Sequence, residues 1–221
     1  GMVTKEWIEE KRKIWGEDHP YWFGRVLGEF PQSSQYSIIS IEWIMRAVDR
    51  EIPGNDQLKV GGLDVSKGGT DETVHLILEG KRVSRIVGFH KVDINETVGW
   101  AKNMCKEEQL SVYAIDEGGL AGIAGFLEEE NYPTLRFQFG GAVEDNEDFD
   151  NTGAWAWWML REAFQNNDIS IPDDPILIGQ LSARKFETTS RGKKKIRLES
   201  KRDAKSRGIA SPDRGDALAM A

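Results

Sequence analysis

The chain has 221 residues, of which 39% are hydrophobic and 30% charged, and this composition is typical of a globular protein and not of a disordered one. No apolar run approaches the roughly 20 residues of a membrane-spanning helix, and the first residues are too charged for a signal peptide, so we expect neither. The single cysteine, Cys105, excludes an internal disulfide bond, and three scattered histidines give no zinc spacing. We therefore expect a reducing, intracellular setting.

The net charge of −8 argues against a nucleic-acid partner until its distribution is considered. Residues 180–207 hold 11 Lys and Arg against 3 Asp and Glu, whereas the rest of the chain holds 18 against 34. An acidic body with one basic segment can bind a polyanion locally. A solvated charged hairpin explains the same pattern, so charge alone leaves both interpretations open.

Residues 1–57 differ in character from the rest. They are rich in Trp and charge, with Pro-containing turns and too little apolar periodicity for an independent domain. Thr4 is a suitable cap for a first helix, and Ile41–Val48 predicts a second. We interpret 1–57 as a short, mainly helical appendage or linker, and 58–221 as the main domain.

From residue 58 onward the pattern predicts three strands joined by tight turns, then strands alternating with helices, then a closing helix. The predicted strands are 58–65, 73–78, 82–92, 111–115 and 135–139. The predicted helices are one capped by Asn95, one near Ala121, one that opens at Asn151 or Thr152, and one that starts at Pro212 with Ser211 as cap. This order predicts an α/β fold, with an RNase H-like mixed β-sheet flanked by helices on both faces.

Three aspartates occupy positions suited to a metal site. Asp64 lies in GGLDVSKGG near the end of a strand, Asp116 follows the strand in VYAIDEGG, and Asp216 lies in the closing helix, in SPDRGDALAMA. Ligands in open α/β sheets gather at the carboxyl ends of strands. Hydrolysis of a phosphodiester is aided by two divalent cations about 4 Å apart, and Mg²⁺ or Mn²⁺ prefers carboxylate oxygens. Each strand-end aspartate also fits a plain turn residue.

Other residues are secondary candidates. Asp213 lies in the first turn of the closing helix, where its charge suits the helix dipole, so we favour Asp216 over it as the inward carboxylate. Asp71 is either a supporting acid or an exposed loop acid. Lys201 either contacts a phosphate or is solvated. Trp155, Trp157 and Trp158 are either a platform for base stacking or, as we favour, part of the core.

Four segments resemble, in order, the C-terminal nuclease domain of phage terminase large subunits. They are GLDVSKGGTDETVHLI, VYAIDEGGLAGIAGFL, NTGAWAWWMLREAFQNNDISIPDD and IRLESKRDAKSRGIASPDRGDALAMA. The family has an RNase H-like fold and cuts concatemeric DNA during genome packaging. The resemblance places its catalytic, metal-binding acids on Asp64, Asp116 and Asp216, with Asp213 and Asp71 less favoured and with two Mg²⁺ or Mn²⁺ ions.

The resemblance also implies partners. These are double-stranded DNA, the terminase ATPase domain, the small terminase subunit and the portal, in the cytoplasm of a bacterial host carrying a phage or prophage. The segment Lys5–Pro31 resembles the piece that joins ATPase to nuclease. The chain has no GxxxxGK[ST] motif, so we expect no ATP site in it. The expected DNA-binding residues are Arg184, Lys185, Arg191, Lys193, Lys194, Lys195, Arg197 and Lys201.

Two other functions remain open. The chain is alternatively a noncatalytic module that docks DNA or assembles the packaging motor. It is alternatively another RNase H-like nuclease, such as a junction resolvase or a transposase core. Cation uptake at the acidic site separates the first alternative from a nuclease, and cutting of branched DNA would indicate the second.

Overall fold

The structure is a computed structural model that describes residues 4–15, 22, 26, 37–52, 58–66, 71–90, 93–118, 122–143, 147–189 and 193–221. The helices are α1 (Lys5–Trp15), α2 (Ile41–Ala47), α3 (Ile94–Glu108), α4 (Ile123–Glu128), α5 (Thr152–Gln165), α6 (Pro175–Ala183), α7 (Lys201–Ser206) and α8 (Asp213–Met220). The strands are β1 (Lys59–Asp64), β2 (Thr73–Glu79), β3 (Arg82–Phe89), β4 (Val112–Asp116), β5 (Thr134–Phe137), β6 (Phe186–Thr188) and β7 (Ile196–Leu198). Within these ranges no helix is long and apolar enough to cross a bilayer.

The main sheet has the strand order β3-β2-β1-β4-β5. The pairs β1–β2 and β2–β3 are antiparallel, as short turns between consecutive strands require, and β1–β4 and β4–β5 are parallel. This confirms the predicted meander followed by crossovers, and the predicted mixed sheet flanked by helices. The strand predicted at 82–92 ends at Phe89, and residues 91 and 92 lie outside the described residues.

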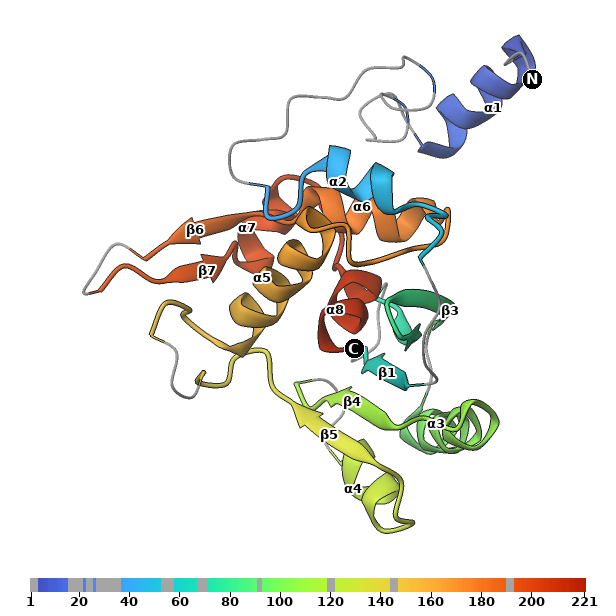
Figure 1. The fold of residues 1–221 in the computed structure, drawn as a ribbon, viewed down its shortest axis with the longest axis vertical. Helices are drawn as coiled ribbons and strands as arrows, with labels where there is room; N and C mark the ends of the chain where they lie inside the picture. The colour runs from blue at the N-terminus through green and yellow to red at the C-terminus, as the bar shows by residue number, and fades with distance from the viewer. Residues whose placement is uncertain are drawn as a thin grey trace.

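Side chains on the sheet alternate between two cores. Leu63, Ile77 and Ile115 join the core beneath α3 and α4, whereas Val74 and Leu76 join the core beneath α5, α6 and α8. Figure 1 shows α8 between the sheet and helices α5 and α6. The period of two in strand side chains therefore decides which residues face α8.

Helix α8 lies directly on β1. A Cβ atom added to Gly62 would lie 2.0 Å from the carbonyl oxygen of Ala217, so only a glycine lets the two backbones come this close. The predicted capping of this helix was wrong. The N-cap is Pro212 and not Ser211. The side chain of Pro212 forms no capping hydrogen bond with the helix.

Helix α2 contributes to the same core as α5 and α6. Ile41 and Ile44 are buried, and Ile38 and Ile39 just before them are fully buried. The division of the chain at residue 57 stays a prediction. The packing of α2 is an observation that favours a core beginning near Ser37, where a β-bridge to Lys185 starts the described segment.

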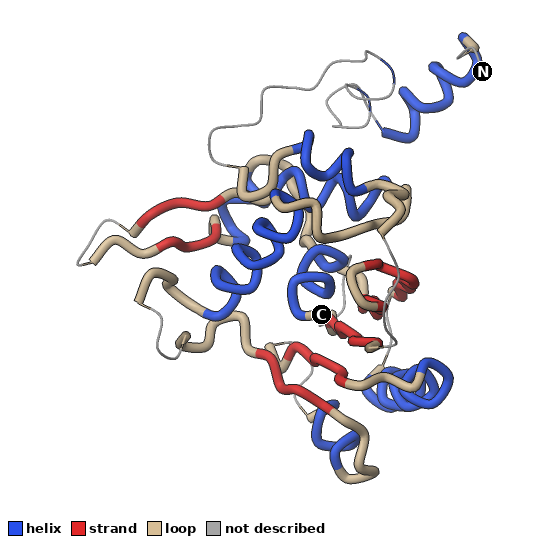
Figure 2. Tube along the Cα trace, in the orientation of Figure 1, coloured by secondary structure: helices blue, strands red, loops and turns tan. Residues whose placement is uncertain are grey.

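Several local details differ from the sequence prediction. Asp93, not Asn95, caps α3 by accepting a hydrogen bond from the backbone N–H of Glu96. Thr4 and Asn151 cap α1 and α5 as predicted. Helices α6 and α7 were not predicted. The basic segment does contain a hairpin, formed by β6 and β7, which extends away from α5 and α7 (Figure 2).

A buried polar pair lies under the opposite face of the sheet. The Nδ1 atom of His75 is 2.8 Å from the hydroxyl oxygen of Tyr113, and the ring of His75 meets Trp100 edge-on. His75 is fully buried, and its Nε2 atom has no hydrogen-bond partner among the described residues. Burial lowers the pKa of His75 from its usual value near 6.5 to about 4.

This pair predicts a pH-dependent stability. The unfolded chain takes up a proton on His75 below about pH 6.5, and the folded chain does so only near pH 4. The contribution of neutral His75 is therefore complete above pH 6.5 and is lost as the pH falls toward 4, up to about 3 kcal/mol. Urea unfolding at neutral pH and at about pH 5 measures it. The wild type is expected to lose more stability than His75→Gln, and equal losses would contradict the assignment.

Candidate metal centre

Asp64 and Asp116 end two neighbouring parallel strands. Leu63 is paired with Ile115 in the register of β1 and β4, so the aspartates that follow lie side by side at the carboxyl ends. Alternation puts both on the face that carries α8. Asp64 is 8% exposed and Asp116 is half-buried. The Oδ1 atom of Asp116 accepts a hydrogen bond of 2.9 Å from the N–H of Gly118, which fixes the turn after β4.

Helix α8 brings two further carboxylates to this place. Asp213 and Asp216 are its first and fourth residues, and they are 6% and 3% exposed. Asp213 accepts a hydrogen bond of 2.8 Å from the N–H of Glu72, and Asp216 accepts one of 2.8 Å from Nε1 of Trp157. Asp213 was interpreted from sequence as a structural residue favoured by the helix dipole, and it is buried near Asp216.

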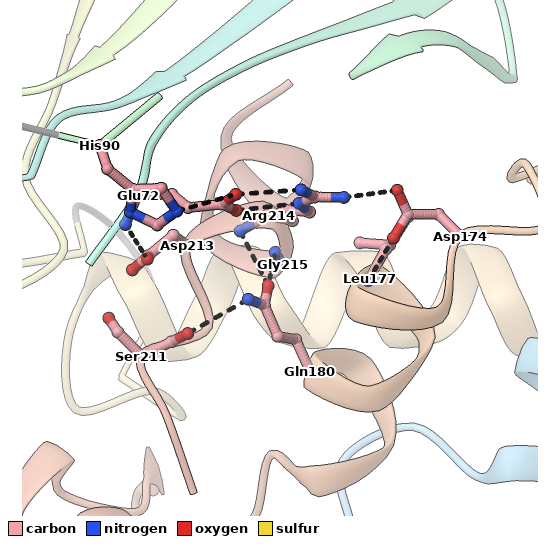
Figure 3. A network of polar contacts seen from close by, with 9 residues as sticks. All are labelled: Glu72, His90, Asp174, Leu177, Gln180, Ser211, Asp213, Arg214 and Gly215. Carbon is pink, nitrogen blue, oxygen red and sulfur yellow. Dashed lines mark hydrogen bonds and ion pairs between the residues drawn. The ribbon is translucent and has the colours of Figure 1, made fainter. Parts of the chain in front are cut away.

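Residues far apart in sequence hold the start of α8 (Figure 3). The side-chain oxygen of Gln180 accepts hydrogen bonds from the N–H groups of Arg214 and Gly215, and its amide donates to the carbonyl of Ser211. Arg214 donates two hydrogen bonds to Glu72 and one to Asp174. Gln180 thus caps the N-terminus of α8 from another helix. The bidentate ion pair between Arg214 and Glu72 connects α8 to the residue before β2.

The four carboxylates share one electrostatic environment. Burial raises the pKa of Asp64 well above its usual value, and the charges of Asp216, Asp213 and Asp116 raise it further, in that order. Burial also raises the pKa of Asp216, although Arg184, Lys201 and the hydrogen bond from Trp157 act in the opposite direction. Asp64 is therefore the carboxylate that all three of the others repel.

Two cations lie near this acidic cluster. The Nζ atom of Lys201 is 4.0 Å from Oδ2 of Asp216, and Arg184 lowers the pKa of the same carboxylate. Trp157 is fully buried, and Trp158 packs against the core, in agreement with the core interpretation, while Trp155 is exposed. Asp71 is exposed and lines a cavity together with Asp213.

The expected DNA-binding residues are not equivalent. Lys193 pairs with Glu147 and Arg197 with Glu187, both on the surface, and Lys194 is exposed. Lys185 and Lys195 are half-buried. Arg184 is buried, and Arg191 lies outside the described residues. Sequence reasoning missed Glu72, Asp174, Gln180 and Arg214, because nothing local marks a partner of a distant helix.

The oxygen donors and the negative charge of the acidic cluster are those that a hard divalent cation prefers. All its donors are carboxylate oxygens, and buried carboxylates that repel one another need positive charge to stay ionised. Within the described ranges, however, no three Asp, Glu, His or Cys side chains are already arranged to hold an ion. A bound ion would therefore have to draw these carboxylates closer together.

Comparison with known proteins places this fold. No protein-family model matches the chain, and no curated protein sequence matches it either. Among solved structures, a mutant nuclease domain of the large terminase subunit of bacterial virus Sf6, solved with manganese, superimposes with a TM-score of 0.66 at 20% identity, over 83% of this chain and 97% of that one. The large terminase nuclease of thermophilic phage G20c superimposes with a TM-score of 0.64 at 14% identity, over 85% and 97%.

The chain has the fold of phage large-terminase nuclease domains. A third such domain, from Thermus phage P74-26, gives a TM-score of 0.58 at 12% identity over 84% of this chain and 93% of that one. The predicted RNase H-like fold and the predicted resemblance to terminase nuclease domains are thereby confirmed. Mutant Sf6 domains have been solved with calcium and manganese, and the G20c nuclease with magnesium and cobalt.

Proposed function

We propose that this chain is a divalent-metal-dependent endonuclease of a phage or prophage terminase, which cuts concatemeric duplex DNA. The convergence of Asp64, Asp116 and Asp216 at one end of the sheet, on a fold of terminase nucleases, carries the proposal. In this proposal these three residues hold Mg²⁺ or Mn²⁺, with Asp213 and Asp71 as less favoured ligands. Two bound ions would supply Lewis acidity toward the attacking and leaving oxygens of the phosphodiester.

The chain's own residues would orient the substrate around that centre. Lys201, beside Asp216, would contact a phosphate and offset the acidic charge. The cations of residues 184–197 would hold the DNA backbone with little sequence preference, because phosphate contacts carry no base information. Trp157 would hold Asp216 in place through its N–H group.

The setting of the domain is part of the proposal. Residues 1–57 would be the linker or appendage that follows a terminase ATPase domain, and 58–221 the nuclease. The small terminase subunit and the portal would be its partners, in the cytoplasm of a bacterial host. The solved neighbours that carry metals support divalent ions in such a domain, and each is described as a terminase nuclease.

Metal dependence is the direct test. We expect the protein to cut plasmid DNA with Mn²⁺ or Mg²⁺ and to stop in EDTA, because carboxylates without metal ions cannot stabilise the negative charge that develops on the phosphodiester oxygens. Mn²⁺ should also raise the thermal midpoint, since a ligand at a hundred times its Kd stabilises a protein by about 2.7 kcal/mol. Gel analysis and thermal unfolding with and without Mn²⁺ measure both effects, and excess Mn²⁺ after EDTA is the reversal control.

The noncatalytic alternative has one observation in its favour, the lack of a ready-made group of three ligands in the described part of the chain. It predicts DNA binding without cutting and no effect of Mn²⁺ on thermal unfolding. That pair of results would overturn the nuclease proposal. Cutting that persists in EDTA would overturn the metal assignment.

A further inference from the structure

Arg184 differs from the other basic residues of its segment. It follows α6 immediately, and its backbone carbonyl accepts a hydrogen bond from Ile38, which ties the residue to the start of the core. Its side chain is turned inward and the residue is only 8% exposed. The carbon at the centre of its guanidinium lies 5.7 Å from the centre of the Trp157 ring. Arg184 therefore belongs to the wall of the site and not to the outer surface of the hairpin.

The charges of Asp216 and Glu199 attract Arg184, but only from beyond ion-pair distance. Among the described residues no carboxylate lies within ion-pair distance of its guanidinium, and its buried Nε atom donates no hydrogen bond. Arg214, which is half-buried, forms ion pairs with Glu72 and Asp174. A buried charge without a partner is strongly unfavourable unless a ligand completes it. In the free protein, burial lowers the pKa of Arg184, and the attraction to Asp216 and Glu199 offsets this only in part.

Two cavities meet at this residue. One, of about 460 Å³, is lined by Asp213, Lys201 and Lys205, and the other, of about 380 Å³, is lined by Asp216, Lys201 and Arg197. Arg184 and Lys201 line both cavities. Acidic side chains, among them Glu72 and Glu199, line the cavities as well, so an anion here would rely on Arg184 and Lys201 for attraction.

A backbone phosphate has the chemistry that this junction lacks. The planar guanidinium of Arg184 presents N–H groups in a fork, and two oxygens of one phosphate match this fork. An isolated phosphate ion shares the chemistry of one such group, so the experiment must separate the two sources.

We propose that Arg184 binds a phosphate of the DNA backbone where the two cavities meet, beside the acidic cluster. The proposal rests on the proposed function for its substrate, DNA, but not for any step of cleavage. It assigns Arg184 a particular phosphate, the one beside the acidic cluster. The guanidinium of Arg184 is then already in position for the phosphate before DNA binds.

The test measures binding of a short labelled DNA duplex and of the matching single strand in EDTA, by fluorescence anisotropy at several salt concentrations. Arg184→Met keeps an unbranched side chain against Trp157 and removes the charge. We expect about tenfold weaker binding, a salt slope smaller by about one unit, and a thermal midpoint of the free protein that is unchanged or higher. Arg184→Lys keeps the charge without the fork and should bind between the two. Arg202→Met is the matched control, because Arg202 is 95% exposed on α7, and it should change binding less.

Other results would overturn the proposal. Arg184→Met could bind DNA with wild-type affinity and salt slope, which would leave Arg184 a structural residue. If Arg184→Met fails to fold, wild-type binding by Arg184→Lys would exclude the bidentate contact. Inorganic phosphate could raise the thermal midpoint of the wild type alone while both proteins bind DNA equally, which would assign the site to free phosphate. Because every measurement is made in EDTA, a failure of metal-dependent cutting leaves these results unaffected.

Discussion

Asp64→Asn is expected to reduce metal-dependent DNA cutting by on the order of a thousandfold or more, because it removes the central charge of the proposed metal site. Asparagine has the shape of aspartate and keeps one oxygen, so the fold should survive. Asp64 is the residue whose pKa is raised by the charges of Asp116, Asp213 and Asp216 together. Single-turnover cleavage of a labelled duplex with Mn²⁺ measures the loss.

The stability of Asp64→Asn separates a catalytic role from a structural one. Removing a buried carboxylate that three others repel should leave the thermal midpoint of the metal-free protein unchanged or higher. The same change should abolish the stabilisation by Mn²⁺. Asp168→Asn is the matched control, since Asp168 is an exposed acid paired with Lys81 on the other side of the fold and should keep full activity. Equal cutting by Asp64→Asn and the wild type would remove Asp64 from the site.

The choice between Asp213 and Asp216 follows from the same measurement. Asp216 contributes the largest repulsion at Asp64 and lies within reach of Lys201, which favours it as the ligand. Asp213 is held by the backbone of Glu72. We therefore propose that Asp216→Asn loses the response to Mn²⁺ and that Asp213→Asn mainly loosens the contact between α8 and β2.

The placement of Asp64 and Asp116 was predictable because it depends on local rules. Strands show their period of two in sequence, and a carboxylate that ends a parallel strand lies at the ligand-binding edge of the sheet. The closing helix was predictable from Ser211 and Pro212, although Pro212 and not Ser211 is its cap. These rules operate over a few residues, so a single sequence is enough to apply them.

The support around α8 was not predictable because it is non-local. Gln180 caps α8 from 34 residues away, and Glu72 pairs with Arg214 across 142 residues. Each is an ordinary polar residue in its own segment, and only the packing of α6 and β2 against α8 gives it a role. Arg184 was predicted as one cation of a basic run, and its burial against Trp157 follows from the same packing.

Gly62→Ala is expected to lower the free energy of unfolding by about 3 kcal/mol or more, or to prevent folding, because overpacking against a backbone cannot be relieved by rotating a side chain. The added methyl carbon would lie 2.0 Å from the carbonyl oxygen of Ala217. The change tests sterics, since no unusual backbone angle marks Gly62. Urea unfolding of both proteins measures the difference.

Gly99→Ala is the matched control for this prediction. Gly99 lies in the middle of α3, and a methyl group there meets no atom within 4 Å. Alanine should therefore stabilise the protein by about 0.5–1 kcal/mol, through its higher helix propensity. Opposite signs for the same chemical change would show that the site at Gly62 is governed by contact with α8. Equal effects would mean that α8 does not lie on β1.

The response of Gly62→Ala to metal connects the packing to the site. Ala217 follows Asp216 directly, so any shift of α8 away from β1 also moves Asp216 away from Asp64. A folded Gly62→Ala protein should thus bind Mn²⁺ more weakly although all its carboxylates are present. Asp64→Asn would remove a ligand and leave the geometry, whereas Gly62→Ala would keep the ligands and change the geometry. Weakened Mn²⁺ binding in both variants requires that α8 and β1 build the centre together, which neither residue alone could demonstrate.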